Sequence, residues 1–129
     1  MGITYVEAEV SNEAGMAQKV RFLVDSGAAY SVLPQEVWRA LGLRPTRTVD
    51  FALADGTIIR RDVSHCFFHF QDVRAPSPVV LGEAQNAALL GTVTLENLEN
   101  MGLVLDPFQR TLRPARLKLA AVGPPTASA

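Results

Sequence analysis

One aspartate in this chain stands in a setting suited to acid–base chemistry. Asp25 follows the apolar run Phe22-Leu23-Val24 and precedes Ser26 and Gly27. The apolar run predicts a buried strand and the glycine predicts a turn, so the carboxylate should lie exposed at the end of a rigid element. A general acid or base requires such a fixed and accessible group. The chain contains this Asp-Ser-Gly sequence only once.

The elements that must position Asp25 are predicted to be mostly short strands, with two short helices. Apolar patterning predicts strands over residues 3–10, 17–24, 46–54 and 57–70, a short buried strand over 79–82, and a strand, turn and strand over 103–112. Helices are predicted over 33–42, with Pro34 as the first helical residue, and over 94–101, with Thr92 or Thr94 as the cap. Asp55-Gly56 predicts a two-residue hairpin turn, and the prolines within residues 71–78 predict a loop.

The composition is that of a compact globular protein. The 129 residues suit one domain, which we expect to span residues 1–121, followed by a flexible tail over 122–129. The 12 basic and 13 acidic residues nearly cancel, so we expect no nucleic-acid partner. No apolar run is long enough to span a bilayer and no signal peptide is visible, so we expect no membrane partner. One cysteine excludes an intrachain disulfide and suits the reducing cytoplasm, which is the expected location.

Three motifs, in order, give the chain a family resemblance. The segment from Phe22 to Ala28 resembles the catalytic loop of the retroviral-type (retropepsin-like) aspartic proteases, and in particular of their small cellular and prokaryotic relatives. The hairpin turned at Asp55-Gly56 resembles the flap that closes over substrate in that family. Leu89-Leu90-Gly91, followed by a predicted helix, resembles the family's second apolar-apolar-glycine motif. The resemblance covers most of residues 1–113 and implies a mostly-β, closed-barrel-like acid protease fold with a flap hairpin and two short helices.

The resemblance also implies roles for individual residues. Asp25 would be the catalytic acid and base, Ser26 would hold two such loops together through its hydroxyl, and Gly27 would allow close backbone approach. The residues that bind substrate would be Ala28 and Ala29 along its backbone, Ala54, Asp55, Gly56 and Thr57 at the flap tip, and Leu89, with Tyr30 and Val32, in side-chain pockets.

The single Asp-Ser-Gly sequence implies a homodimer. Hydrolysis of a peptide bond by carboxylates needs two of them, one that takes a proton from water and one that protonates the carbonyl oxygen. Two neighbouring carboxyl groups share a proton because both cannot ionise cheaply. The second carboxylate would therefore be Asp25 of another copy, with the site on a two-fold axis. We expect a homodimer that cleaves peptide or protein substrates and needs no cofactor.

The chain departs from the viral members of the family at two positions. Many of those proteins carry an acid where Ala29 stands and an arginine where Thr92 stands, and the two groups form an ion pair near the dimer contact. Because both are absent here, neither leaves a buried charge without a partner.

Other interpretations stay open. The chain could be a retropepsin-like dimerisation or peptide-binding module with weak or no catalysis, although it keeps Asp25. A processing domain within a larger polyprotein is less favoured because the chain begins with methionine. His65 and His69 share one face of a predicted strand, Cys66 points to the other face, and no further histidine or cysteine could complete a metal site. We therefore expect no metal.

Overall fold

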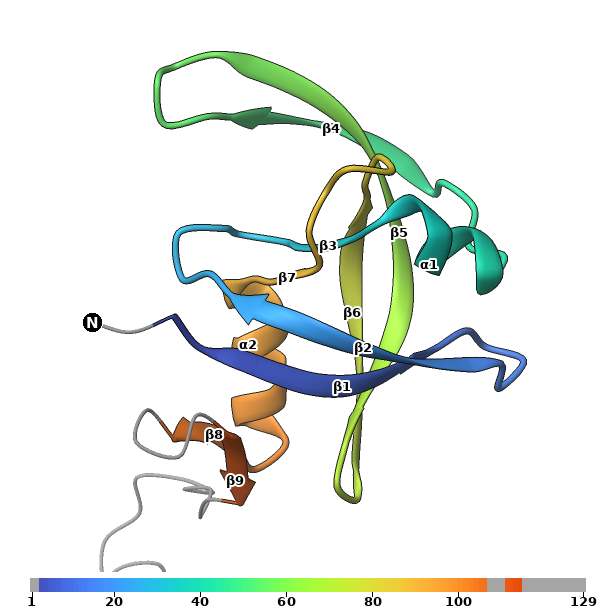
Figure 1. The fold of residues 1–129 in the computed structure, drawn as a ribbon, viewed down its shortest axis with the longest axis vertical. Helices are drawn as coiled ribbons and strands as arrows, with labels where there is room; N and C mark the ends of the chain where they lie inside the picture. Colours follow the sequence, from blue (N-terminus) through green and yellow to red (C-terminus); the bar gives the residue numbers. More distant parts are fainter. Residues whose placement is uncertain (1–2, 107–110, 115–129) are drawn as a thin grey trace, which may run out of the picture.

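The computed structural model describes residues 3–106 and 111–114. Within these residues the chain forms nine strands and two helices, coloured along the sequence in Figure 1. The helices are α1 (Gln35–Ala40) and α2 (Thr92–Asn100). The strands are β1 (Tyr5–Ser11), β2 (Ala17–Val24), β3 (Ser31–Leu33), β4 (Arg47–Ala52), β5 (Ile58–Phe70), β6 (Val73–Leu81), β7 (Leu89–Leu90), β8 (Leu103–Asp106) and β9 (Thr111–Pro114).

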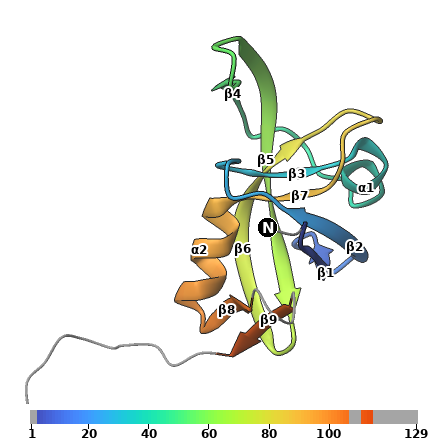
Figure 2. The same cartoon turned by 60° about the vertical axis from the view of Figure 1, so that its left-hand side comes forward.

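Seven strands form one sheet that curls into a ring. Their order is β1-β2-β7-β3-β6-β5-β4, and a further pairing of β1 with β5 joins the two ends of the first six strands. Among the described strands β4 pairs with β5 alone, so it is an edge strand of the sheet, and with the start of β5 it forms a hairpin that projects from the ring (Figure 1, Figure 2). β8 and β9 form a separate two-stranded sheet. The predicted mostly-β fold with two short helices is confirmed, and its sheet is ring-like.

Apolar side chains from alternating strand positions fill the ring. In β1 the residues at positions 6, 8 and 10 are all buried. Phe22 of β2 and Phe68 of β5 are fully buried, and their ring centroids lie 5.5 Å apart. Removal of this apolar surface from water is the main stabilising contribution to such a fold. Burial also raises the pKa of the Cys66 thiol to about 12, so the thiol stays protonated at neutral pH.

The loop predicted over residues 71–78 is wrong, because most of it belongs to β6. β6 pairs with β5 along its length, without a break at Pro76 or Pro78. The two prolines are two residues apart, so both missing N–H groups face the same edge of the strand. β3 pairs with β6 only from Val79 onward, and the Pro76 carbonyl on the edge away from β5 accepts a hydrogen bond from the Asn97 side chain. The prolines therefore fit where β6 has no second strand beside it.

The helix predicted over residues 33–42 is shorter than expected. Its first residue, Leu33, belongs to β3, which at three residues is too short to show a strand period. Pro34 is the N-cap of α1 rather than its first helical residue, and its ψ of 157° is extended. Gly42 follows the helix with a φ of +64° and ends it as predicted.

The second helix also begins earlier than predicted. α2 begins at Thr92, and its N-cap is Gly91 rather than Thr92 or Thr94. Thr94 is instead fully buried, and its hydroxyl shares hydrogen bonds of 2.6 Å with Ser31 and 2.8 Å with Ser77. The threonine therefore connects α2 to β3 and β6 (Figure 2).

The loop after β2 caps α2. The first N–H groups of an α-helix have no partner within the helix. Here the Thr92 N–H donates to the Ala28 carbonyl at 2.9 Å, and the Val93 N–H donates to the Ala29 carbonyl at 3.0 Å. The N-cap residue supplies no side-chain hydrogen bond. The loop that carries Asp25 and the start of α2 therefore hold each other in place.

Gly91 permits this close approach. A Cβ atom at this position would lie 2.6 Å from the carbonyl carbon of Tyr30, 2.7 Å from its oxygen and 2.9 Å from the Ala28 oxygen. All three are backbone atoms, which cannot rotate away as a side chain can. The Gly91 N–H also donates to Ser31 Oγ at 2.9 Å. Glycine is required here by space and not by backbone angle, since its φ is −95°.

Some predicted features lie outside the described residues. These are the tail over 122–129, the domain boundary at residue 121 and part of the turn at Asp106-Pro107. Across residues 3–106 and 111–114, no helix combines the length and apolar character needed to cross a membrane.

Replacement of Gly91 by alanine should destabilise the fold and displace the loop. The added methyl group would press on the backbone at Tyr30 and Ala28, and overpacking of this kind costs about 1–3 kcal/mol. We expect a lower midpoint of urea unfolding with an unchanged slope. We also expect amide chemical shifts to change over residues 25–30.

Gly15→Ala is the control for this variant. An added Cβ at position 15 meets nothing within 4 Å, so only the strain of its φ of +91° remains. The control should lose some stability and leave the shifts of residues 25–30 unchanged. A Gly91→Ala protein with the parent's shifts over that loop would contradict the packing argument.

Candidate active site

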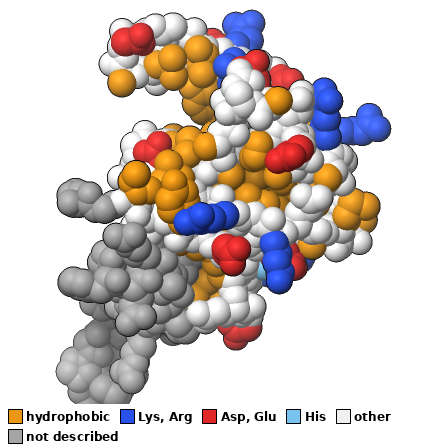
Figure 3. Space-filling model, viewed as in Figure 1, with side chains coloured by type: hydrophobic (Ala, Val, Ile, Leu, Met, Phe, Trp, Pro, Cys, Tyr) orange, Lys and Arg blue, Asp and Glu red, His pale blue; other side chains and the backbone are white. Residues whose placement is uncertain are grey.

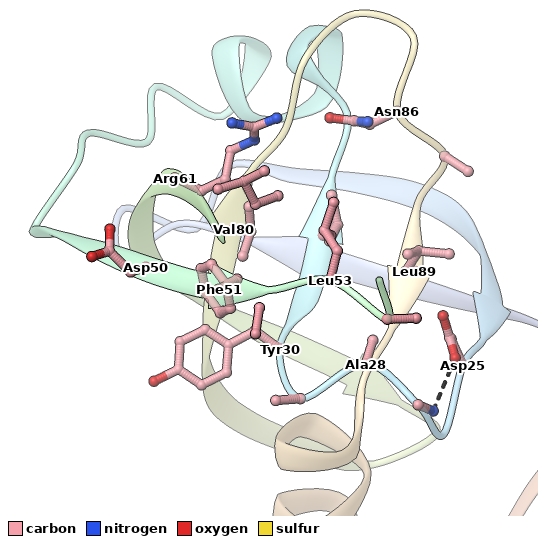
Figure 4. A pocket seen from close by; sticks show the side chains of 17 residues that line it. Asp25, Ala28, Tyr30, Asp50, Phe51, Leu53, Arg61, Val80, Asn86 and Leu89 are labelled. Carbon is pink, nitrogen blue, oxygen red and sulfur yellow. Dashed lines mark hydrogen bonds between the residues drawn. The ribbon is translucent and has the colours of Figure 1, made fainter. Parts of the chain in front are cut away.

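Asp25 is positioned by the pairing of β2 with β7. Leu23 and Val24 run parallel to Leu89 and Leu90. The Asp25 N–H continues this pairing by donating to the Leu90 carbonyl at 3.0 Å. The half-buried side chain then points into a pocket (Figure 4).

The turn after Asp25 fixes the orientation of its carboxylate. The Gly27 N–H donates to Asp25 Oδ1 at 2.9 Å, which is the dashed line in Figure 4. The Ala28 N–H donates to the Asp25 carbonyl at 3.1 Å. Aspartate commonly stabilises turns in this way. The carboxylate is therefore held by backbone groups of its own loop and remains open to the pocket.

The pocket has a volume of about 600 Å³ and lies between this loop and the β4–β5 hairpin. Figure 3 shows hydrophobic side chains on the hairpin and on the facing body, across a hollow. The volume is in the range of ligand-binding sites. The predicted residues that line the pocket are Asp25, Gly27, Ala28, Ala29, Tyr30, Val32, Ala54 and Leu89.

Four predicted site residues, at two places in the chain, do not line the pocket. Ser26 is exposed in the turn, and its hydroxyl has no hydrogen-bond partner within the part of the chain that the structure describes. Asp55, Gly56 and Thr57 lie at the hairpin tip and are also exposed. A single chain therefore brings together the aspartate loop and the flank of the hairpin, but not its tip.

The hairpin tip is a three-residue loop, so the predicted two-residue turn is wrong. The Leu53 N–H donates to the Thr57 carbonyl at 2.7 Å, and the Gly56 N–H donates to the Leu53 carbonyl at 2.9 Å. With a φ of +88° at Gly56, this is a type I turn followed by a left-handed glycine. The side chain and then the backbone N–H of Thr57 donate to Asp55, and these hydrogen bonds lower the pKa of its carboxyl. Asp-Gly occurs in both two-residue and three-residue hairpin loops, so the dipeptide alone does not predict the length of the loop.

Much of the pocket wall was not predicted from the sequence. The lining residues that it did not identify are Asp50, Phe51, Ala52, Leu53, Ile59, Arg61, Val80, Asn86 and Ala87. The period of two along the hairpin was an available signal. Phe51 pairs with Ile59, and Val49 pairs with Arg61. Residues at alternate positions of paired strands share a face, so Ile59 and Arg61 could have been assigned to one side.

Tyr30 connects the aspartate loop to the hairpin. Arg47 Nη2 donates to the Tyr30 hydroxyl at 2.6 Å. The Tyr30 ring packs edge-on against Phe51, with centroids 5.5 Å apart and an interplanar angle of 72°. Arg47 and Phe51 both belong to β4. These contacts make one continuous wall from two segments that are distant in the sequence (Figure 4).

The histidine and cysteine side chains of β5 lie apart from the pocket lining. No three histidine, cysteine, aspartate or glutamate side chains within the described ranges gather in a group that could hold one. His69 Nε2 shares a hydrogen bond of 2.7 Å with Ser11 Oγ, and Cys66 is buried on the other face of β5. At the two positions that depart from the viral pattern, the Thr92 hydroxyl donates to the Ala29 carbonyl at 3.5 Å.

Comparisons with known proteins agree with this geometry. The family described as "gag-polyprotein putative aspartyl protease" matches residues 14–97, which include Asp25, the β4–β5 hairpin and most of α2. No curated protein matches the chain significantly.

Solved structures that are similar to this one include two proteases. The solution structure of the simian foamy virus (mac) protease has a TM-score of 0.51 and 21% identity, and the match covers 76% of this chain and 96% of that chain. A crystal structure of a retropepsin-like aspartic protease from Rickettsia conorii has a TM-score of 0.46 and 24% identity, over 81% of this chain and 85% of that one. The similarity of fold therefore rests on the foamy virus protease.

The family match spans most of the chain and contains both the aspartate loop and the hairpin that faces it, so this protein belongs to the retropepsin-like aspartic proteases.

Proposed function

We propose that this protein is an aspartic endopeptidase that acts as a homodimer, with Asp25 of each copy at a shared site. The observation that carries the proposal is the Asp25 carboxylate itself. It is half-buried, held at one oxygen by the Gly27 N–H, and aimed into a pocket of about 600 Å³. An accessible carboxylate in a fixed orientation is suited to proton transfer.

The second carboxylate comes from the second copy. Besides Asp25, the carboxylate that lines the pocket among the described residues is Asp50. Its Oδ1 accepts a hydrogen bond from Arg60 Nε at 2.9 Å, so this carboxylate already has a cationic partner. Two copies of Asp25 across a two-fold axis would share one proton. One carboxylate then takes a proton from water, while the other protonates the oxygen of the scissile carbonyl. The reaction uses no cofactor.

One feature of the aspartate loop supports this dimer. Ser26 is exposed next to Asp25, with a hydroxyl that has no partner among the described residues, so it is available to bond the matching loop of the partner. The carbonyls of Ala28 and Ala29 are already used by α2. Ala28 and Ala29 also line the pocket, where they would contact a bound peptide.

The β4–β5 hairpin serves as the flap in this proposal. Phe51 and Ile59 supply its apolar inner face, and they lie opposite Leu89 in the pocket lining. The tip residues Asp55 to Thr57 extend beyond the pocket of one chain, where they would meet a bound peptide or the partner's hairpin. A peptide in the pocket would thus be enclosed by loop and hairpin.

Asp25→Asn should abolish peptide cleavage with little loss of stability. Asparagine keeps the Oδ1 acceptor for the Gly27 N–H but cannot ionise, so the turn should persist while proton transfer fails. We expect kcat to fall by about a hundredfold or more, measured on a peptide library by mass spectrometry. Asp72→Asn makes the same charge change at an exposed turn between β5 and β6 and should cleave like the parent. Equal cleavage by Asp25→Asn and the parent would refute the catalytic assignment, and no cleavage by either would favour a peptide-binding module.

Mixtures of parent and Asp25→Asn chains should test whether each copy supplies one carboxylate. With random pairing in an equal, co-refolded mixture, about a quarter of the dimers contain two Asp25 residues. We therefore expect about a quarter of the parent's activity at the same total chain concentration. An activity of about half would mean that each chain works alone.

The pH dependence of kcat/KM should be bell-shaped. Turnover by the pair requires one protonated and one ionised carboxyl group, so the rate should fall when both are protonated and again when both are ionised. Peptide cleavage measured from about pH 3 to about pH 9, with the dimer verified at each pH, gives the profile. A single rise that stays flat to high pH would instead indicate a base such as histidine, and His65 and His69 would then be the residues to change.

A further inference from the structure

One pocket residue carries a positive charge that the proposed chemistry does not use. Arg61 lies on β5. Among the described residues that line the pocket, it is the one with a cationic side chain. Figure 4 places Arg61 beside Val80 and near Asn86, well separated from Asp25. Apolar residues such as Val32, Phe51 and Leu89 make up much of the lining in between. The pocket therefore has a carboxylate at one end and a guanidinium at the other.

Arg61 keeps much of its binding capacity free. Its Nη1 donates to the Arg60 carbonyl at 3.0 Å, and its Nη2 donates to Glu83 Oε1 at 3.4 Å. A guanidinium carries five N–H donors, so these two contacts leave others available. The side chain is 33% exposed, whereas that of Glu83 is 58% exposed. A single, long and partly solvated contact of this kind is weak.

The neighbouring ion pair differs from this one. Arg60 Nε donates to Asp50 Oδ1 at 2.9 Å, so the carboxylate of Asp50 already has a close cationic partner. Asp50 therefore has Arg60, and not Arg61, as its cationic partner. A second carboxylate that entered this end of the pocket would meet the unfilled donors of Arg61. It could form the paired hydrogen bonds that arginine makes with carboxylates, which are stronger than one long contact.

We propose that Arg61 selects substrates that carry an acidic side chain, separated from the scissile bond by apolar residues. The proposal rests on the proposed endopeptidase function and names its substrate class. The carboxylate of the peptide takes the place of Glu83 on Arg61, while the apolar residues of the peptide occupy the walls between Arg61 and Asp25. Because a two-fold dimer presents one Arg61 at each end of its site, the selection applies on both sides of the scissile bond.

Matched peptides test this selection directly. Peptides with an apolar centre are made in pairs that differ only by glutamate or glutamine, with the pair scanned through the flanking positions. Cleavage is measured at about pH 6, where a peptide glutamate is ionised. At one or more positions the parent should favour glutamate by about tenfold in kcat/KM, and in Arg61→Gln the ratio of the glutamate to the glutamine value should fall to about one. A preference that survives in Arg61→Gln, or no preference in the parent, would overturn the proposal.

Glu83→Gln separates a binding role from a structural one. If Arg61 serves only to pair with Glu83, the two variants should have the same small effect on stability and leave selectivity alone. If Arg61 binds substrate, Glu83→Gln removes its competitor and should raise the preference for glutamate, opposite in sign to Arg61→Gln. Arg61→Lys keeps the charge without the paired donors and should retain part of the preference. An unchanged preference in Glu83→Gln contradicts the displacement of Glu83.

Binding measurements keep the result independent of catalysis. The same peptides, labelled with a fluorophore, are titrated with the Asp25→Asn protein and with the Asp25→Asn, Arg61→Gln double variant. Tighter binding of the glutamate peptide by the first protein alone would support the selection even if no peptide is ever cleaved, in which case only the proposed function fails. Equal affinities for the two peptides, or no binding of either, would overturn the proposal about Arg61.

Discussion

Hydrogen bonds between the backbone of the aspartate loop and the first turn of α2 hold the site together. They satisfy two N–H groups that a helix cannot pair by itself, and they satisfy the carbonyls of Ala28 and Ala29 as well. The same segment reaches Asp25 from the other side, because β7 accepts its N–H through Leu90 and continues through Gly91 into α2. Asp25 thus lies between two anchors that belong to one short stretch of chain. A change in that stretch would move the carboxylate directly.

The two walls of the pocket are built in different ways. The aspartate loop is fixed by backbone hydrogen bonds and by the buried hydroxyl groups of Ser31 and Thr94. The hairpin wall reaches that loop through side chains, chiefly by the contacts of Tyr30 with Arg47 and Phe51. The wall that carries Asp25 is thus fixed by backbone hydrogen bonds, whereas the facing wall is joined to it by side chains, an arrangement that suits the function proposed above.

Much of the fold was predictable from the sequence, and the exceptions have physical causes. The long strands were recognisable because alternation repeats over many residues, as in β2 and β5. β6 was missed because Pro76 and Pro78 normally end strands, and only the pairing shows that their missing N–H groups face an edge without a neighbouring strand. The start of α2 was placed too late because threonine is a good cap, whereas here the cap comes from a loop more than sixty residues earlier in the chain.

The same difference between local and long-range information applies to the candidate site. Asp25 and its turn were identified because a local motif carries all the information. Arg61 was not, because its role depends on which side of a hairpin faces the pocket and on how the loop after β6 positions Glu83. Pairing between distant segments of the chain decides both of these features, and no local sequence pattern predicts that pairing.

Strand β5 pairs with different strands along its length. Val63 is fully buried and pairs with Arg47 of β4 on one side and with Val80 of β6 on the other. Before it, β5 is held by β4 alone, and after it by the ring. A displacement of the hairpin about Val63 would therefore break none of the ring's hydrogen bonds. Such a displacement would be a local event, separate from global unfolding, so sequence changes along the outer hairpin would alter access to the pocket with little effect on the stability of the ring.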